Sequence, residues 1–257
     1  MPDPLPPLAL TVVVITRDAG AELAACLASA DFATESIVVD SGSADDTVEI
    51  ARACGARVVE QAWLGFGAQK NFAVAQARHD WILCLDTDER VSPELAKSIK
   101  AALAAPVNVA YAMPRRNRFL GRWLKHGEGY PDWNVRLFDR RHARWSDDVV
   151  HEHVLADGPV GKLAGDLLHA SAESLDAYLA KQNRYTTLQA QALYQRGERF
   201  SALRFVLSPL LRFVRFYVIR AGFLDGTAGL AHIAIGCFNS FCKYLKLRAL
   251  EQAERVR

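Results

Sequence analysis

The stretch WILCLDTDERVSPE, residues 81–94, joins an apolar run to a cluster of acids and the start of a helix. Its first five residues, 81–85, predict a buried strand, because uninterrupted apolar runs are typical of strands covered on both faces. Three acids follow directly: Asp86, Asp88 and Glu89. Ser92 then has the character of a helix N-cap and Pro93 that of a first helical residue. We therefore predict a strand, an acidic turn and a helix, in this order.

Strands and helices alternate on both sides of this stretch up to about residue 104. Apolar, β-branched runs predict further strands at residues 8–18, 35–40 and 56–61. Helical spacing of apolar residues predicts helices at residues 21–30, 45–55, 65–79 and 92–103. This alternation predicts an α/β fold with a parallel sheet covered on both faces.

Ligands of such sheets bind beyond the carboxyl ends of the strands, so polar residues directly after the strands are the candidates for a site. These residues are Thr16, Arg17, Asp18, Asp40, Ser41, Ser43, Asp86, Thr87 and Asp88. From about residue 105 to 165 the chain is rich in Arg, aromatic residues and His, which indicates short strands and functional loops. After residue 166 helical patterns dominate, with a helix expected from Ser174 to Arg196 and another from Pro209.

The charge of the chain changes sign along its 257 residues. Residues 1–100 carry 8 basic and 15 acidic side chains, a net charge of −7, whereas residues 171–257 carry 13 and 6, a net charge of +7. A basic end of this kind suits nucleic acid, anionic lipid or the acidic part of its own chain. The bulk composition, 51% hydrophobic and 23% charged, is that of a folded globular protein.

The cysteines and the N-terminal residues bear on the cellular setting. The number of cysteines, five, is odd, and none forms a C-x-x-C pair, so we expect reduced thiols and neither a disulfide frame nor a zinc site. Residues 1–9 lack the basic region and long apolar run of a signal peptide. We expect them to form a short, flexible leader.

Asp86-Thr87-Asp88 is suited to hold a cation and a diphosphate. A turn at the strand end brings two carboxylates together, and Mg²⁺ commonly takes one or two carboxylates plus substrate phosphates. The alternative is a solvated loop that caps the following helix. Asp40 and Ser41 offer a carboxylate and a hydroxyl after a second buried strand, suited to a base or to ribose hydroxyls. Asp45 and Asp46, by contrast, are expected to cap a helix.

The segments TVVVITRD (11–18), IVVDSGSADDT (37–47), GFGAQKN (65–71) and WILCLDTDE (81–89) together resemble the nucleotide-sugar half of family 2 glycosyltransferases. The resemblance implies the GT-A fold, with a mostly parallel central sheet, over residues 10–165. It implies nucleoside contacts for Thr16, Arg17 and Asp40, and ribose and metal–diphosphate contacts for Asp86 and Asp88. Residues 121–140 and 150–154 are similar to bacterial lipopolysaccharide inner-core β-1,4-glucosyltransferases, which implies a UDP-sugar donor and a lipid-linked saccharide acceptor.

Lys70 and Asn71 stand at a helix start near the same edge of the sheet. Lys70 there suits the binding of a phosphate or the orientation of an acid; the alternative is a surface lysine.

Inverting transfer needs one base to take the proton of the acceptor hydroxyl. Asp132, in YPDWNVRLF, is the candidate, with Arg136 four residues on; Pro131 stands where many relatives have Glu. The rival bases are Glu128 and Glu152.

His151, Glu152 and His153 form a second polar cluster. His151 is a candidate ligand for Mg²⁺ or Mn²⁺, or for the diphosphate, and His169 is a weaker candidate of the same kind. Glu152 is a candidate for substrate binding. The alternative for these histidines is a structural role, in which each lies in the interior and is satisfied by hydrogen bonds. A zinc protease is excluded, because H-E-x-x-H is absent. A further cluster, of basic and aromatic residues, suits the binding of an anionic acceptor; a solvated loop is the alternative. Such clusters also occur in nucleic-acid grooves, but the sheet motifs disfavour nucleic acid here. The cluster consists of Arg115, Arg116, Arg118, Arg122, Lys125, Phe119 and Trp123.

The segment SPLLRFVRFYVIR, residues 208–220, predicts a basic amphipathic helix. At about 100° per residue, Arg212, Arg215 and Arg220 fall within one arc and the apolar residues on the other. Such a helix lies on an anionic membrane surface, so we expect residues 166–257 to be a helical region that holds the protein peripherally on the cytoplasmic side of the inner membrane. A helical subdomain packed on the catalytic domain, or a dimer contact, is the alternative.

The patterns together favour a metal-dependent, inverting glycosyltransferase that moves a hexose, glucose by resemblance, from a UDP-sugar to a lipid-linked saccharide. A membrane-associated scaffold that binds nucleotide-sugars without transfer is the second hypothesis. A Rossmann-type NAD enzyme is disfavoured, because no G-x-G-x-x-G follows the first strand. The leading hypothesis requires four acids to meet around a single cleft: Asp40, Asp86, Asp88 and Asp132.

Overall fold

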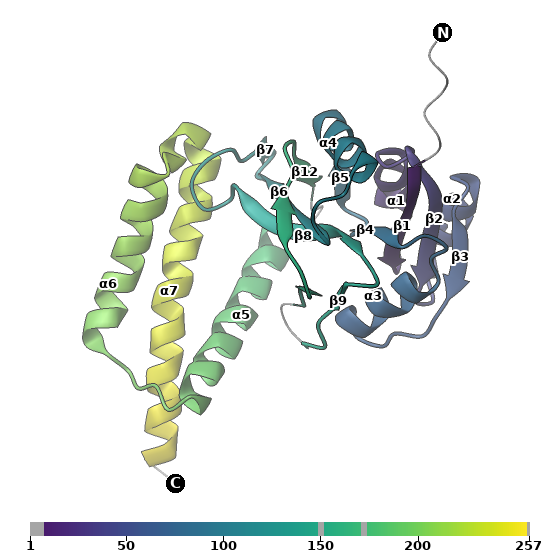
Figure 1. Cartoon of the computed structure of the whole chain (residues 1–257). Helices are drawn as coiled ribbons and strands as arrows, with labels where there is room; N and C mark the ends of the chain where they lie inside the picture. Colours follow the sequence, from purple (N-terminus) through teal and green to yellow (C-terminus); the bar gives the residue numbers. More distant parts are fainter. Residues whose placement is uncertain (1–7, 149–151, 171–173, 256–257) are drawn as a thin grey trace. The chain divides into compact units, whose positions relative to one another are not determined.

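The computed structural model describes residues 8–148, 152–170 and 174–255. These residues form two compact units (Figure 1). The first takes in the described residues of Met1–Arg115 and Asp132–Ala170, and the second those of Arg116–Pro131 and Ser171–Arg257. The division falls inside strand β6 (Ala110–Phe119), which therefore contributes to both units.

The first half of the sheet in unit one is parallel, as the alternating pattern predicted. Its strands lie in the order β3-β2-β1-β4. Their bounds are Arg57–Glu60 for β3, Ala33–Asp40 for β2, Leu8–Thr16 for β1 and Trp81–Leu85 for β4. The connecting helices are α1 (Gly20–Ala28), α2 (Thr47–Ala53), α3 (Phe66–Ala75) and α4 (Pro93–Ala104).

Both faces of these strands are buried, which explains their unbroken apolar sequences. Val12 and Val14 of β1 pack on one face with residues of α1, α2 and α4. Val13 and Ile15, which point the other way, pack on the opposite face with residues of α3. The period-two alternation of a strand thus distributes one apolar run between two cores.

The second half of the sheet is antiparallel in most of its pairings, so the complete sheet is mixed. Strand β8 (Asp132–Asp139) pairs antiparallel with both β4 and β6, and β12 (Leu167–His169) pairs antiparallel with β5 (Glu89–Val91). The reason is that the described residues between 105 and 165 supply no helix for the crossover that parallel strands require. The remaining strands are β7 (Arg122–Trp123), β9 (Ala143–Trp145), β10 (Val154–Ala156) and β11 (Val160–Lys162).

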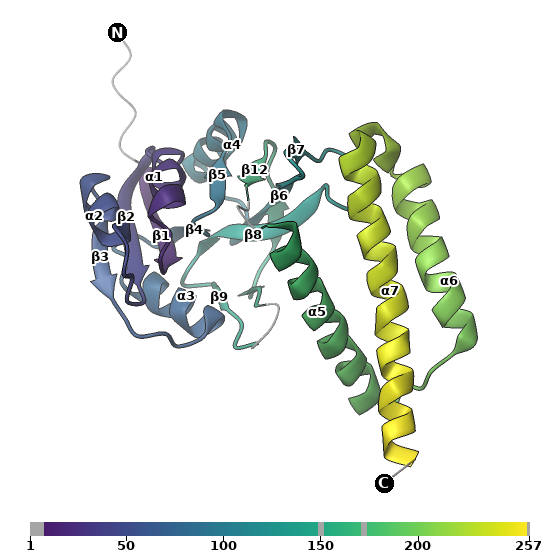
Figure 2. The same cartoon turned by 180° about the vertical axis from the view of Figure 1, so that it is seen from behind.

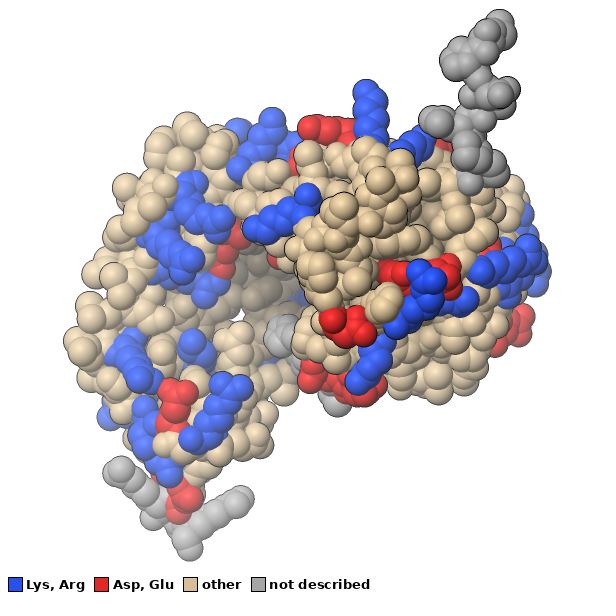
Figure 3. All heavy atoms as spheres, viewed as in Figure 1, with Lys and Arg blue, Asp and Glu red and all other residues tan. Residues whose placement is uncertain are grey.

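Unit two is mainly helical. Its helices are α5 (Leu175–Gln195), α6 (Ala202–Phe213) and α7 (Gly226–Arg255), and α7 lies between α5 and α6 (Figure 2). A π-helical segment, η1 (Val214–Ile219), and a 3₁₀ segment, η2 (Gly222–Asp225), join α6 to α7. Blue Lys and Arg side chains predominate over red Asp and Glu on the face of these helices seen in Figure 3. Within the described residues, no helix has the length and apolarity needed to cross a membrane.

The starts of α4, α5 and α6 follow local capping chemistry, but one predicted helix start is wrong. Ser92 caps α4 as predicted, and Ser174, expected as the first residue of a helix, is the cap of α5; each accepts a hydrogen bond from the backbone three residues on. The expected helix start at Pro209 is wrong, because α6 begins at Ala202 with Ser201 as its cap and contains Pro209 in its interior. Pro209 has no N–H to donate to the carbonyl of Phe205, a loss that the neighbouring turns tolerate.

Candidate active site

The carboxyl ends of three parallel strands bring the predicted donor-side residues to one edge of the sheet. Thr16 ends β1 opposite Asp40, which ends β2. Val14 pairs with Leu85, the last residue of β4, so Asp86 follows at the same level. The polar residues that directly follow or end these strands therefore gather where a ligand of such a sheet binds.

Asp40 is buried and shapes its own loop. Its Oδ2 accepts hydrogen bonds from the backbone N–H groups of Gly42 and Ser43, both at 2.9 Å, and its Oδ1 accepts from the Ser43 hydroxyl at 2.5 Å. Gly42 has a φ of +87°, in the left-handed region that glycine adopts without strain. Asp45 forms a turn directly before α2, since its Oδ1 accepts from the Thr47 backbone at 3.0 Å, whereas Asp46, the N-cap residue of α2, makes no side-chain capping bond.

The neighbouring predicted residues differ in their exposure. Ser41 accepts a hydrogen bond from the Gln69 amide at 3.0 Å. Thr16 is buried, and its hydroxyl has no hydrogen-bond partner among the described residues. Arg17 is exposed and lies 3.6 Å from the Asp18 carboxylate. Thr16 is thus a buried polar group that a bound molecule would satisfy, and Arg17 is free to reorient.

The GFGAQKN motif brings helix α3 against the acids. Gly65 has a φ of +99° at the helix start, and a Cβ at Gly67 would lie 2.1 Å from the Ser146 carbonyl oxygen, so only glycine permits this approach. Asn71 then donates to the Trp145 carbonyl at 3.0 Å and accepts from its backbone N–H at 2.9 Å. These two bonds fix Trp145 beside Lys70, which directly precedes Asn71 in the helix.

Lys70 is the buried cation of the site rather than a surface lysine. Its Nζ lies 3.2 Å from Asp86 Oδ1 and 3.0 Å from Glu152 Oε1, and 4.3 Å from the centre of the Trp145 ring. Burial alone would lower the pKa of Lys70, but the Asp86 and Glu152 carboxylates outweigh it and hold that pKa above its usual value. Lys70 therefore stays charged and ties together two acids 66 positions apart in the chain.

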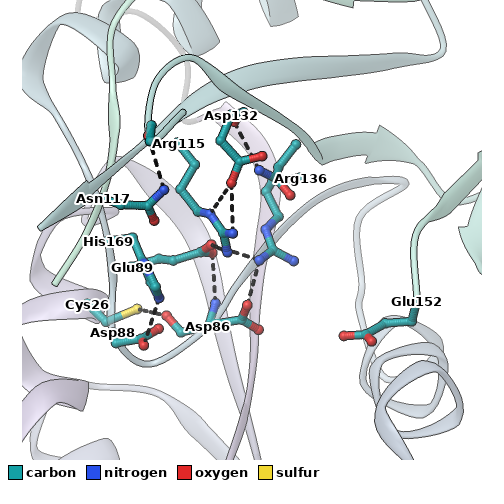
Figure 4. A network of polar contacts seen from close by, with 12 residues as sticks. Cys26, Asp86, Asp88, Glu89, Arg115, Asn117, Asp132, Arg136, Glu152 and His169 are labelled. Carbon is teal, nitrogen blue, oxygen red and sulfur yellow. Dashed lines mark hydrogen bonds and ion pairs between the residues drawn. The ribbon is translucent and has the colours of Figure 1, made fainter. Parts of the chain in front are cut away.

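Asp86 and Glu89 hold the guanidinium of Arg136 between them (Figure 4). One Arg136 nitrogen lies 2.5 Å from Asp86 Oδ2 and 2.7 Å from Glu89 Oε1, and Glu89 also accepts from the Asp86 backbone N–H at 3.1 Å. Burial opposes ionisation of Asp86, yet Arg136 and Lys70 together hold its pKa well below the usual range. Asp86 is thus ionised and already compensated by two cations.

Asp132 joins the same network through Arg115. The register of β6 and β8 places these two residues opposite each other, and Arg115 binds Asp132 Oδ2 with two nitrogens, at 2.9 and 2.8 Å. A third Arg115 nitrogen lies 3.7 Å from Glu89. Asp132 is about one-third exposed, and no described residue donates a hydrogen bond to its Oδ1. Figure 4 shows the resulting chain of contacts from Asp132 to Asp86.

Asp88 lies against His169 on the far side of Asp86. The β5–β12 register sets His169 opposite Glu89, and its Nε2 lies 3.0 Å from Asp88 Oδ2. Burial raises the pKa of Asp88, but the hydrogen bond and charge of His169 outweigh it and lower that pKa. The described residues contain no cluster of three or more acids, histidines or cysteines arranged for a metal. Asp88 and His169 would together ligate a divalent cation only after the His169 Nε2 gives up the proton it shares with Asp88, and diphosphate oxygens would have to complete the set.

Several predicted residues lie elsewhere or outside the described residues. His151 falls within residues 149–151, which the structure does not describe. His153 lies 3.4 Å from Asp148 and receives no contact from the Asp86 network in the described bonds. Glu128, a rival base, belongs to unit two and is paired there with Arg212, whose Nε lies 3.0 Å from its carboxylate. The basic cluster of residues 115–125 is divided, since only Arg115 belongs to unit one.

Two residues of the network, Glu89 and Trp145, had no predicted role, and a third, Arg115, was expected to bind an acceptor. Glu89 is fully buried between two arginines. Trp145 packs against both Lys70 and Arg136, and its indole nitrogen is buried with no hydrogen-bond partner among the described residues. The only sequence signal was for Glu89, which follows Asp86 by three residues at the end of a buried strand.

Comparisons with known proteins bear on the family of the chain. The model of glycosyl transferase family 2 matches residues 11–155. An uncharacterized glycosyltransferase of Rickettsia typhi is 30% identical over 96% of this chain and 89% of its own length. The lipopolysaccharide core biosynthesis glycosyltransferase LpsC of Rhizobium meliloti is 28% identical over 95% of this chain and 93% of its own. Among solved structures, TarS of S. aureus in complex with UDP-GlcNAc covers 96% of this chain and 91% of its own, with 13% identity and a TM-score of 0.49. The chain thus belongs to glycosyltransferase family 2, and its α/β sheet is that of a GT-A enzyme.

Proposed function

We propose that this glycosyltransferase moves a hexose from a UDP-sugar to a hydroxyl of a lipid-linked saccharide, with inversion at the anomeric carbon. The observation that carries the proposal is the chain of ion pairs from Asp86 through Arg136, Glu89 and Arg115 to Asp132. It connects the acids that follow the parallel strands to an acid on β8, within one compact unit. A donor site and a base for the acceptor are thereby held in one framework.

Asp132 is the proposed base. Its Oδ2 is fixed by Arg115, which leaves Oδ1 to take the proton of the acceptor hydroxyl. As that proton leaves, the acceptor oxygen forms a bond to the anomeric carbon and the bond from this carbon to the diphosphate oxygen breaks. The electron pair of the broken bond departs with UDP, so atoms and charges balance in a single displacement. The predicted rival, Glu152, is instead held by Lys70.

The departing diphosphate needs positive charge, and Asp88 with His169 is the proposed point for a divalent cation, Mg²⁺ or Mn²⁺. When bound, such a cation neutralises the charge that develops on the leaving group. The pairing of Asp88 with His169, 3.0 Å apart, supports His169 in the role first expected of His151. Thr16, Arg17, Asp40 and Ser41 would line the nucleoside end of the donor.

The acceptor is proposed to be a saccharide of lipopolysaccharide core type carrying glucose as the new unit. Support comes from LpsC, whose name assigns it to lipopolysaccharide core biosynthesis and which matches nearly the whole chain. A lipid-linked acceptor would hold the reaction at the cytoplasmic side of the inner membrane. The free state of the five cysteines suits such a reducing compartment.

Calorimetry with UDP, with and without Mn²⁺, tests the donor site. We expect Mn²⁺ to strengthen UDP binding to the native protein by about tenfold or more, and Asp88→Asn and His169→Gln each to remove that gain. Asp31→Asn, at an exposed acid of the same unit, is the matched control and should leave it intact. Binding of UDP without turnover of any UDP-sugar would favour the scaffold, and no binding of UDP at all would contradict both functions.

A further inference from the structure

The outer side of α6 and η1 is an apolar surface that no other part of the described chain covers. Neither element contains a buried residue. Exposed fractions range from 37% for Leu207 to 75% for Ile219. The exposed apolar residues of this surface are Leu203, Val206, Leu207, Leu210, Leu211, Val214, Val218 and Ile219. Up to Val218, their spacing of three and four residues places them on one stripe of the helix, here called the outer stripe.

The opposite side of α6 is the one that packs within unit two. Phe205 stacks on Phe241 of α7 with ring centres 4.4 Å apart, and Arg212 donates to the Ser240 hydroxyl at 3.0 Å. The outer stripe is therefore not the face of α6 that packs against α7. It continues past the end of η1 into the turn before α7, where Phe223 and Leu224 are each about half exposed.

The charges around the outer stripe have one sign. Between Glu198 and Asp225 the chain has five arginines and no acidic residue. Arg215 and Arg220 lie over the ring of Phe216, 5.3 and 5.8 Å from its centre, at the edge of the stripe. Arg212, which the sequence pattern grouped with them, is instead half-buried in its pair with Glu128. The surface thus combines an apolar stripe with Arg215 and Arg220, which have no acidic partner among the described residues, whereas Arg204 is paired with Glu198 at 2.7 Å.

We propose that the outer stripe and its arginines bind the surface of an anionic lipid bilayer, with the helix lying in the plane of the interface. Apolar side chains would enter the acyl boundary while Arg215 and Arg220 meet anionic headgroups. A second copy of the chain fits less well, because a two-fold contact through this face would set the same arginines against one another with no acids between them. The inference stands on unit two alone and does not depend on the transferase reaction.

Co-sedimentation of the full chain with vesicles tests the inference. Vesicles of phosphatidylcholine alone are compared with vesicles that also contain phosphatidylglycerol, at low and high salt. We expect binding only to the anionic vesicles, weakened by salt. Each arginine near an anionic surface contributes about 1 kcal/mol, so Arg215→Gln with Arg220→Gln should weaken binding by about thirtyfold. Val206→Ser with Leu210→Ser should weaken it at least as much.

The matched control is Leu179→Ser with Leu188→Ser, two leucines of α5 with similar exposure, 40% and 38%. This variant should bind the anionic vesicles like the native chain, and circular dichroism checks that all variants keep their helices. Equal binding by the outer-stripe variant and the native chain would overturn the inference. So would a native chain that ignores anionic vesicles, or that forms a dimer in solution which Val206→Ser with Leu210→Ser dissociates.

Discussion

Glu89 has no exposed surface, yet both arginines of the site lie against it. It is 2.7 Å from Arg136 and 3.7 Å from Arg115, and these two cations hold Asp86 and Asp132 respectively. Glu89 touches neither proposed substrate, so its role is to position the groups that do. A buried carboxylate that compensates two guanidinium groups is expensive to remove, because it leaves buried positive charge behind.

Glu89→Gln tests this positioning role. The variant keeps the side-chain shape and loses the charge, which weakens charge-assisted hydrogen bonds of about 1.5–3 kcal/mol. We expect kcat for sugar transfer to fall by about 10- to 100-fold while KM for the donor changes little. Steady-state kinetics measure both quantities. Glu94→Gln, at an exposed acid of α4, is the matched control; a Glu89→Gln variant with native kcat would refute the positioning role.

At the scale of elements, the predictable parts of the fold were those set by local sequence. Unbroken apolar runs predicted β1, β2 and β4, and the expected cap at Ser92 marked the start of α4. The antiparallel half of the sheet was not predictable, because the register of β6 and β8 joins residues 17 or more positions apart. The pairing of Arg115 with Asp132 depends on that register, so it could not be predicted either.

The burial of Lys70 shows the same limit at the site. The sequence placed this residue at a helix start but could not say which way the helix faced. Its direction follows from Gly67, whose missing Cβ allows α3 to approach the Ser146 carbonyl. That contact joins segments almost 80 positions apart. By contrast, the gathering of Thr16, Asp40 and Asp86 at one sheet edge followed from strand order alone.

Helix α7 contains a partly buried histidine that makes stability depend on pH. His232 lies against Phe119 and Tyr178, with ring centres 5.2 and 6.3 Å away. Burial, aided by the nearby charge of Arg212, lowers the pKa of His232 to about 4. The unfolded chain takes up a proton near pH 6.5, whereas the folded chain does not until about pH 4. The stabilising contribution of the neutral ring is therefore complete above pH 6.5 and is lost as pH falls toward 4.

Urea unfolding at pH 7 and pH 5 measures this effect. We expect His232 to account for about 2 kcal/mol of the free energy of unfolding lost between these values. His232→Gln should lose correspondingly less on acidification than the native chain. His142→Gln, at a histidine about half exposed, should behave like the native chain. Identical acid sensitivity of His232→Gln and the native chain would contradict the partly buried, neutral state of this ring.

Across the whole molecule, the two ends of the chain use their opposite charges differently. The acids of residues 1–100 include Asp86 and Glu89, whose charges are met by Lys70, Arg115 and Arg136 within unit one. The arginines of residues 199–224 have no acid in their own segment. One end of the sequence thus builds a compensated charge network within unit one, and the other leaves Arg215 and Arg220 without an acidic partner among the described residues, while Arg204 and Arg212 are paired with Glu198 and Glu128. The chain joins these properties in one family 2 glycosyltransferase.

The most direct test of the proposed reaction is the rate of UDP release from UDP-glucose with a lipid-linked core saccharide and Mn²⁺, compared between the native chain and Asp132→Asn. We predict that Asp132→Asn binds UDP with native affinity but releases UDP at least about 100-fold more slowly, the effect expected for loss of a general base. Glu152→Gln should keep most of the native rate. Native UDP release by Asp132→Asn, with loss of release in Glu152→Gln, would contradict the assignment of Asp132 as the base.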